Sequence, residues 1–434
     1  VDRSMLIVES GPFGRRFRML ETMRSFGAER LEATGASAAV ETRHSEWCRS
    51  QLAAIRRLLL GAEEVEGVAR LDELWPNLRA AVDRALGRCD QALAVALVRP
   101  IVAEVLLRSR QEIGDWLERI LRVASPPDDE TVVFCLSWAA RRHAVARERS
   151  AWDRLAADHG PPPDVLVHHA RVFVHDDHAG LLEWAPRASA RLREDGDEQG
   201  ARLAEVDVGA ALLNLGRMAE HDRWMRMLAE RYRVEGPPTL HNWTLMFLGY
   251  SARLRGDDDE AERRFADAVA VRLPPRTHSP SRTIEARDAF RRGEVDRALA
   301  VFDAHLDDLA ATDNMQGVSI TCLELADVLA RLGRLEDSAR MLGYLEATGM
   351  LETPAFMALV ADAEHEVATG GATVARARTE GRELDDREAL ELARAILGRL
   401  LDGNGEAESS DAPGPASVGA SAVTRRRRRR SHQR

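Results

Sequence analysis

Residues 242–274 read NWTLMFLGYSARLRGDDDEAERRFADAVAVRLP, and their pattern returns along much of the chain. A turn at Gly256 and Asp257 divides the stretch into two halves. Apolar or small residues recur at helical spacing in both halves, namely Leu245, Leu248, Gly249 and Ala252, then Ala261, Phe265 and Ala268. Such a stripe on each side of a turn predicts two amphipathic helices folded against each other. The small residues allow a close approach of the helices, and Phe265 fills the remaining space.

The same pattern appears in the neighbouring segments. The turn glycines Gly216, Gly256, Gly293 and Gly333 are 40, 37 and 40 residues apart. Matching apolar or small residues surround the other three turns: Val208, Gly209, Leu212, Met225 and Leu228; Ala286, Ala289, Ala298 and Phe302; Leu325, Ala326, Leu329, Leu342 and Leu345. The pattern resembles the tetratricopeptide repeat, a helical hairpin whose apolar face is covered by the next hairpin. It predicts an all-α, helical-hairpin solenoid over residues 36–400. The alternative, an unrelated helix bundle, gives no reason for regularly spaced turn glycines.

Composition agrees with a helical protein and limits its partners. Of the 434 residues, 45% are hydrophobic and only 5% are aromatic. The formal charge of −10 is uneven, because the last ten residues carry seven arginines and no acid, which leaves −17 on the other 424. An acidic body argues against nucleic acid bound along the repeats. The chain contains no lysine, which excludes a P-loop, because that motif needs a lysine to reach the nucleotide phosphates.

Cysteine spacing and hydropathy indicate the compartment. Cys48, Cys89, Cys135 and Cys322 lie far apart, and no C-x-x-C pair is present. This spacing favours reduced thiols over a disulfide framework or a zinc site. The most apolar window, residues 92–107, is interrupted by charged residues and a proline and is too short to span a bilayer. We expect a soluble cytoplasmic protein.

The first twenty residues contain the predicted β-structure. Residues 4–9 (SMLIVE) and 15–20 (RRFRML) read as two short strands joined by a loop of turn residues. A helix is predicted from about residue 23 to residue 33. A two-stranded hairpin is marginal alone, so it must pack on that helix or on another segment. The chain then divides into residues 1–35, the repeats at 36–400, and a Gly/Ser/Pro-rich segment with a poly-arginine run at 401–434, which we expect to be disordered.

Three segments together resemble one protein family. Residues 1–35 look like the wing and closing helix of the winged-helix module in bacterial signalling ATPases of the STAND class, the ATP-binding regulators grouped with the LuxR-type proteins. Residues 70–86, RLDELWPNLRAAVDRAL, are similar to the family's first repeat helix, and residues 338–397 are similar to its closing segment. The resemblance implies the repeat-bearing C-terminal half of a signalling and transcription regulator. We expect this chain to lack the ATPase domain and the recognition helices.

Histidines gather at residues 168–178, HHARVFVHDDH. A helical stripe of His168, His175 and His178, with His169 and Asp176 beside it, would suit a divalent metal. Ordinary histidines near a turn are the simpler interpretation, and we predict no metal and no cofactor. The acidic residues 257–260 are predicted to begin a helix rather than to bind calcium. No catalytic motif is present, so we predict that the protein is not an enzyme.

One feature has nucleic-acid character, the run Arg425, Arg426, Arg427, Arg428, Arg429 and Arg430. Adjacent guanidinium groups bind any phosphate backbone without reading its sequence. A solubilising tail and internal pairing with the acidic repeats are competing interpretations. The alternative function is therefore a DNA-associated transcription regulator that uses this tail or the DNA-binding domain of a partner.

The favoured function depends on the inner surface of the solenoid. In tetratricopeptide-like arrays the first helix of each pair lines a concave groove. The register places ten residues on or near it: Leu213, Asn214, Trp243, Met246, Tyr250, Arg253, Arg287, Arg291, Asp327 and Arg331. Trp, Tyr and Arg dominate binding hot spots. We predict that this groove binds a peptide, a protein or a small inducer; the alternative is that Trp243 and Met246 only pack between repeats.

Overall fold

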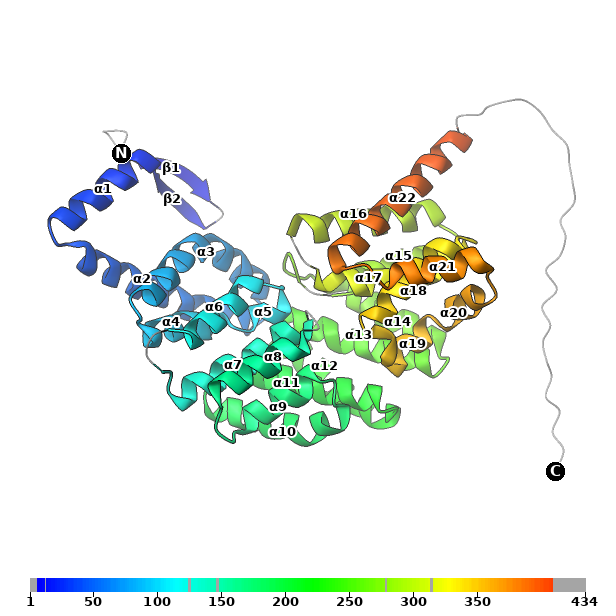
Figure 1. Ribbon diagram of the computed structural model, residues 1–434, viewed down its shortest axis with the longest axis horizontal. Helices are drawn as coiled ribbons and strands as arrows, with labels where there is room; N and C mark the ends of the chain where they lie inside the picture. The colour runs from blue at the N-terminus through cyan, green and yellow to red at the C-terminus, as the bar shows by residue number, and fades with distance from the viewer. Residues whose placement is uncertain are drawn as a thin grey trace, which may run out of the picture.

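A computed structural model of the chain describes residues 6–11, 13–123, 126–145, 148–277, 279–312 and 315–408. Within these ranges a β-hairpin is followed by helices α1 to α22, as Figure 1 shows. The predicted all-α, helical-hairpin architecture is confirmed.

The first half comprises β1 (Leu6–Gly11), β2 (Gly14–Met19), α1 (Glu21–Ala33), α2 (Ser37–Leu59), α3 (Glu64–Gly87), α4 (Gln91–Val98), η1 (Arg99–Ile101), α5 (Glu104–Leu107), α6 (Gln111–Leu121), α7 (Asp129–Val145), α8 (Arg149–His159), α9 (Val165–Val174), α10 (His178–Glu194) and α11 (Glu198–Asn214). The second half comprises α12 (Met218–Glu235), α13 (Pro238–Leu254), α14 (Asp258–Ala270), α15 (Ser281–Arg291), α16 (Val295–Thr312), α17 (Gln316–Arg331), α18 (Leu335–Ala347), η2 (Met350–Glu352), α19 (Pro354–Leu359), α20 (Ala361–Ala368), α21 (Ala372–Gly381) and α22 (Asp386–Glu408).

Helices α13 and α14 form the hairpin predicted at residues 242–274. A Cβ atom on Gly249 would lie 2.4 Å from a ring carbon of Phe265, so the close packing of these helices requires glycine there. The turn residue Gly256 has a φ of 75°, the left-handed conformation that ends many helices. Asp257 then caps α14 by accepting a hydrogen bond from the backbone N–H of Glu260 at 3.1 Å. The same left-handed turn recurs with φ of 71°, 82° and 72° at Gly216, Gly293 and Gly333.

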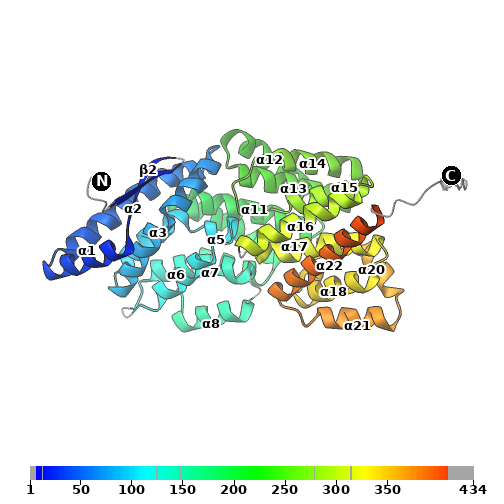
Figure 2. The same ribbon diagram turned by 90° about the horizontal axis from the view of Figure 1, so that it is seen from above.

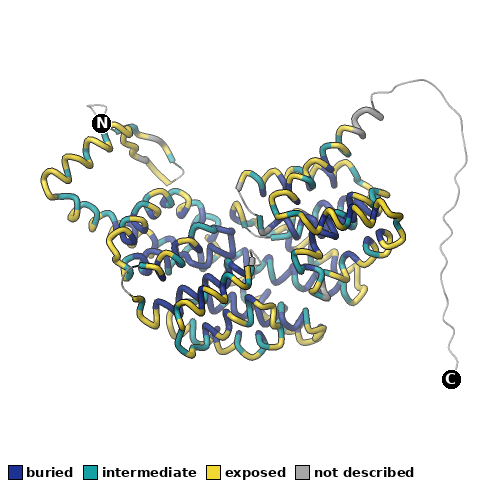
Figure 3. The backbone as a smooth tube through the Cα atoms, viewed as in Figure 1, coloured by how far each residue is buried: buried dark blue, intermediate teal, exposed yellow. Residues whose placement is uncertain are grey.

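The stacked helical hairpins curve into an arch. In Figure 1, α2 to α6 form one arm, α15 to α22 form the other, and α11 to α13 lie between them. Seen from above, the β-hairpin and α1 remain at one end of the stack and α22 at the other (Figure 2). Buried residues run along the surfaces where helices pack on one another (Figure 3). They form one large apolar cluster from residue 48 to residue 248 and another from residue 286 to residue 397.

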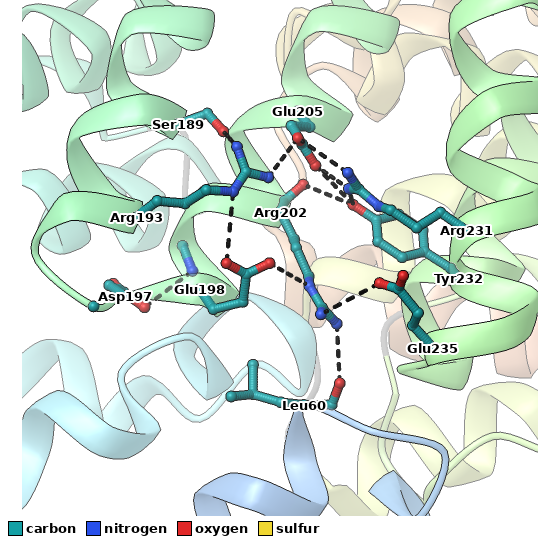
Figure 4. Close-up of polar contacts among 12 residues, drawn as sticks. Leu60, Ser189, Arg193, Asp197, Glu198, Arg202, Glu205, Arg231, Tyr232 and Glu235 are labelled. Atoms are coloured by element: carbon teal, nitrogen blue, oxygen red, sulfur yellow. Dashed lines mark hydrogen bonds and ion pairs between the residues drawn. The ribbon is translucent and has the colours of Figure 1, made fainter.

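The first hairpin of the stack is joined to a turn far along the chain. Arg202 of α11 donates hydrogen bonds to the carbonyl oxygens of Leu60 at 2.9 Å and of Gly236 at 3.0 Å. Figure 4 shows Arg202 reaching Leu60 from within a group of ion-paired residues on α10, α11 and α12. The buried Glu64 carboxylate accepts from the backbone N–H and the hydroxyl of Thr239 at 2.8 and 2.9 Å. The turn between α2 and α3 is thereby fixed to the turn between α12 and α13.

The two ends of the described chain pack differently. Strands β1 and β2 pair antiparallel, with Leu6 opposite Met19. The following helix α1 contains no buried residue, and its Phe26 is 54% exposed, so hairpin and helix protrude from the stack (Figure 3). At the other end α22 packs on α16 and α17 and continues to Glu408, past the predicted end of the repeats at residue 400. The poly-arginine run, to which nucleic-acid binding was assigned as an alternative, lies outside the described residues.

Candidate ligand-binding site

A cavity of about 270 Å³ lies at the centre of the arch, and residues of both arms face it. Most of the side chains in its wall are apolar or aromatic, as in typical ligand sites. The wall of this central cavity consists of Leu106, Arg141, Phe173, Val206, Asp207, Ala210, Leu213, Asn214, Trp243, Met246, Phe247, Tyr250, Pro280, Ile320, Phe356 and Leu359. Helices α11 and α13, the first helices of two successive repeats, supply more than half of these residues.

Five of the ten predicted groove residues line the central cavity. Trp243, Met246 and Tyr250 occupy one face of α13, because they are three and four residues apart. Leu213 and Asn214 come from the last turn of α11. Met246 and Tyr250 are only 2% and 7% exposed, so the cavity wall is also part of the core between repeats. The structure thus brings these five residues together.

Three predicted groove residues lie elsewhere, in ion pairs of their own. Arg291 is 3.6 Å from each of two carboxylates on α14. Asp327 and Arg331, one helical turn apart on α17, pair at 3.0 Å, and Arg331 also pairs with Asp362 at 2.8 Å. The side chain of Arg331 is 50% exposed. Arg291 and Arg331 are held in ion pairs with neighbouring acids, and none of the three residues lines the cavity.

At one end of the central cavity, which we call the paired end, Asp207 is bound by both Arg141 and His169. Arg141 binds both carboxylate oxygens of Asp207, through Nη1 at 2.9 Å and through Nη2. His169 Nε2 lies 3.1 Å from Oδ2 of Asp207. Burial alone would raise the pKa of Asp207, but Arg141 and the hydrogen bond from His169 lower it to about 2. Burial also lowers the pKa of His169, so its imidazole is favoured in the neutral form.

The other two predicted residues, Arg253 and Arg287, lie in a second charged cluster, which we call the open end. It comprises Tyr250, Arg253, Arg287 and Glu324, packed around the ring of Phe265. Arg287 Nη1 donates to both oxygens of Glu324, at 2.8 and 2.7 Å. The guanidinium carbons of Arg253 and Arg287 lie 4.9 and 5.2 Å from the centre of the Phe265 ring. Positive charge therefore exceeds negative charge among these five residues.

Several donors at the open end lack partners. Nε and Nη2 of both Arg253 and Arg287 are buried without a hydrogen-bond partner among the described residues. Burial and the nearby charge of Arg287 lower the pKa of Arg253 to about 10. Burial raises the pKa of the adjacent Asp288, whose Oδ1 is 3.9 Å from Nη2 of Arg287. The carboxylates of this region thus compensate the two guanidinium groups only in part.

Eleven of the sixteen residues in the cavity wall lie outside the prediction, and only some of them have a signal in the sequence. Val206 and Ala210 occupy the positions 40 residues before Met246 and Tyr250, so the repeat spacing contains the signal that finds them. The short helix α19 contributes Phe356 and Leu359 and contacts α11, α13 and α17. Residues 354–359 match no position of the repeat pattern, and no sequence signal predicted that they close one side of the cavity.

The histidines of residues 168–178 point to different partners. His168 stacks on Trp184 with ring centres 4.5 Å apart, and His175 lies 3.0 Å from Asp153. His169 belongs to the paired end of the central cavity. Across the described ranges, no group of three His, Cys, Asp or Glu side chains is placed to hold a metal ion. The structure therefore gives no support to the alternative of a shared metal-binding stripe.

Cys48, Cys89, Cys135 and Cys322 are all free. Among the described helices, none combines the length and the apolar character that crossing a bilayer would need.

Comparisons of the chain with protein-family models, with curated proteins and with solved structures found no match.

Proposed function

We propose that the chain is a non-enzymatic helical-repeat module that binds a peptide, a protein segment or a small inducer in its central cavity. The cavity itself carries the proposal, because apolar and aromatic side chains from both arms converge there around a few polar groups. One of these groups, Asn214, donates through Nδ2 to the Ala210 carbonyl at 3.0 Å, while its Oδ1 is buried without a donor in the described part of the chain. A ligand that donates to Oδ1 would satisfy it.

The polar groups in the cavity wall suit binding better than catalysis. A general base needs a pKa near the working pH and a free lone pair directed at its substrate. Asp207 instead holds its charge with a pKa of about 2, and its oxygens accept from Arg141 and His169. Such a carboxylate is a weak base. We therefore assign the wall a role in recognition.

We further propose that the module is the repeat half of a STAND-class, LuxR-type regulator and acts in the cytoplasm. The order of elements supports this assignment, since a β-hairpin and one helix precede the repeats, as in the family that residues 1–35 resemble. Phe17 and Phe26, 61% and 54% exposed, give the hairpin and α1 an apolar surface that the remainder of a winged-helix module would cover. Four free cysteines agree with a reducing compartment.

Filling the cavity tests the proposal. Ala210→Trp places a large side chain in the cavity wall, while Ala266→Trp makes the same change at an exposed position of α14. We expect ligands that raise the thermal midpoint of the wild-type chain, found by screening peptides and metabolites, to lose this effect on Ala210→Trp and to keep it on Ala266→Trp. Circular dichroism checks that both variants are folded. Ligands that stabilise both variants equally would contradict the assignment of the cavity.

A further inference from the structure

The unused guanidinium donors at the open end lie one helical turn beyond the wall of the central cavity. We infer that Arg253, with Arg287 beside it, binds the carboxylate of a small apolar acid whose hydrocarbon part occupies the central cavity. This inference rests on the proposed function and specifies the chemical class of its ligand.

The first observation is that Arg253 lacks an anionic partner. Its Nε and Nη2 are buried, and neither has a hydrogen-bond partner among the described residues. Its guanidinium lies over the Phe265 ring, with 4.9 Å between the guanidinium carbon and the ring centre. A cation held against an aromatic ring with unused N–H groups is ready to accept an anion, because guanidinium donors match the two oxygens of a carboxylate.

The neighbouring acids leave this capacity free. Both oxygens of Glu324 accept from Nη1 of Arg287, so Nε and Nη2 of Arg287 also remain unsatisfied. Asp288 is the other nearby acid, and its Oδ1 lies 3.9 Å from Arg287, beyond hydrogen-bond distance. Glu324 is thus the one acid of the described residues that hydrogen-bonds to this pair, and an incoming carboxylate would supply acceptors for the remaining donors of both arginines.

The second observation connects this cluster to the cavity. Tyr250 lines the cavity and precedes Arg253 by three residues, so the two side chains are neighbours on α13. Both also contact the same ring, since the Tyr250 and Phe265 ring centres are 5.4 Å apart. On α17, Ile320 lines the cavity one turn before Glu324. One turn beyond the apolar wall, α13 therefore places Arg253, and α17 places Glu324, the acid that holds Arg287.

The size and chemistry of the cavity define the rest of the ligand. A volume of about 270 Å³ is slightly below the roughly 300–1,000 Å³ of common ligand pockets, which favours a small ligand. This space suits a medium-length hydrocarbon chain better than a peptide segment. The ligand is therefore a small acid with an apolar chain, and a medium-chain fatty acid is a suitable probe.

The experiment compares octanoate, octanol and acetate by isothermal titration calorimetry on the full chain. We expect octanoate to bind at least about tenfold more tightly than octanol, as one charge-assisted hydrogen-bonded contact implies, and acetate to bind weakest. Arg253→Met should weaken octanoate about tenfold and leave octanol unchanged, while Arg253→Lys should retain part of the preference. Arg263→Met removes the same charge from a side chain that is 64% exposed on α14, and should bind all three probes like the wild type.

The outcomes separate the two proposals. Equal binding of octanoate and octanol to the wild type, or undiminished octanoate binding to Arg253→Met, would overturn the carboxylate assignment while the cavity remains a ligand site. Failure of every probe on the wild type overturns the carboxylate assignment, and only the Ala210→Trp screen then decides whether the cavity binds anything. The comparison of probes on the wild type needs no variant and stands even if Arg253→Met does not fold.

Discussion

The paired end in the wall of the central cavity and the open end just beyond that wall use the same residue types for different purposes. At the paired end, Arg141 gives its donors to a carboxylate that also accepts from His169. At the open end, Arg253 has unused buried donors beside a second arginine whose acid is already engaged. A saturated buried ion pair holds helices together, whereas an unsaturated cation stores a cost that a ligand can relieve. We therefore propose a structural role for the paired end and a binding role for the open end.

Breaking the paired end should have the largest effect. Arg141→Met leaves the buried Asp207 carboxylate with only its hydrogen bond from His169, and we expect the free energy of unfolding to fall by about 3–5 kcal/mol. The double variant Arg141→Met with Asp207→Leu removes both charges and should recover most of that loss, because an apolar pair of similar volume is often nearly neutral. Urea unfolding followed by far-UV circular dichroism measures both. If the double variant is no more stable than the single one, the loss of stability does not come from breaking the ion pair between Arg141 and Asp207.

Acid should weaken the paired end by a smaller amount. The pKa of Asp207 is lower in the folded chain, about 2, than its ordinary value of 3.8, so the unfolded chain binds more protons between these values. The stabilisation is complete above about pH 4 and is lost as the pH falls through 2, in total about 2 kcal/mol. Unfolding free energies measured across this window should fall less steeply for Asp207→Asn. Parallel curves for the two proteins would place the acid sensitivity elsewhere.

The open end should show the smallest change in stability. Arg253→Met removes a cation that has no carboxylate partner, so we expect the free energy of unfolding to change by less than about 1 kcal/mol. Arg287→Met is the matched comparison on α15, since it leaves the Glu324 carboxylate buried without its partner and should cost several times more. The same urea titrations compare the two. Equal losses would remove the distinction between the two arginines.

The local pattern of the sequence predicts the repeats and part of the cavity. The left-handed turns recur at regularly spaced glycines, and Gly249 packs on Phe265. Both features depend on contacts between neighbouring helices, so the residues of each segment are enough to predict them. Trp243, Met246 and Tyr250 follow from helical spacing on α13. These features need no knowledge of distant parts of the chain.

The rest of the site depends on contacts that local patterns do not encode. Arg141 and Asp207 are 66 residues apart, and α7 lies in a region where the repeat pattern fits poorly. The placement of Arg291 and Arg331 was decided by acids on adjacent helices, which a helical register alone does not reveal. Phe356 and Leu359 reach the cavity because α19 leaves the repeat pattern and lies against α11 and α13.

The contact between the hairpin of α2 and α3 and the turn before α13 should change how this array unfolds. Repeat proteins whose units contact only their neighbours can lose terminal units one at a time. Here the backbone of Gly61 lies so close to Gly236 that an added Cβ would be 2.5 Å away, and Glu64 holds Thr239. The helices between these points are enclosed by a contact 175 residues apart in sequence, so they should melt as one cooperative block and fold more slowly than an open array of equal length.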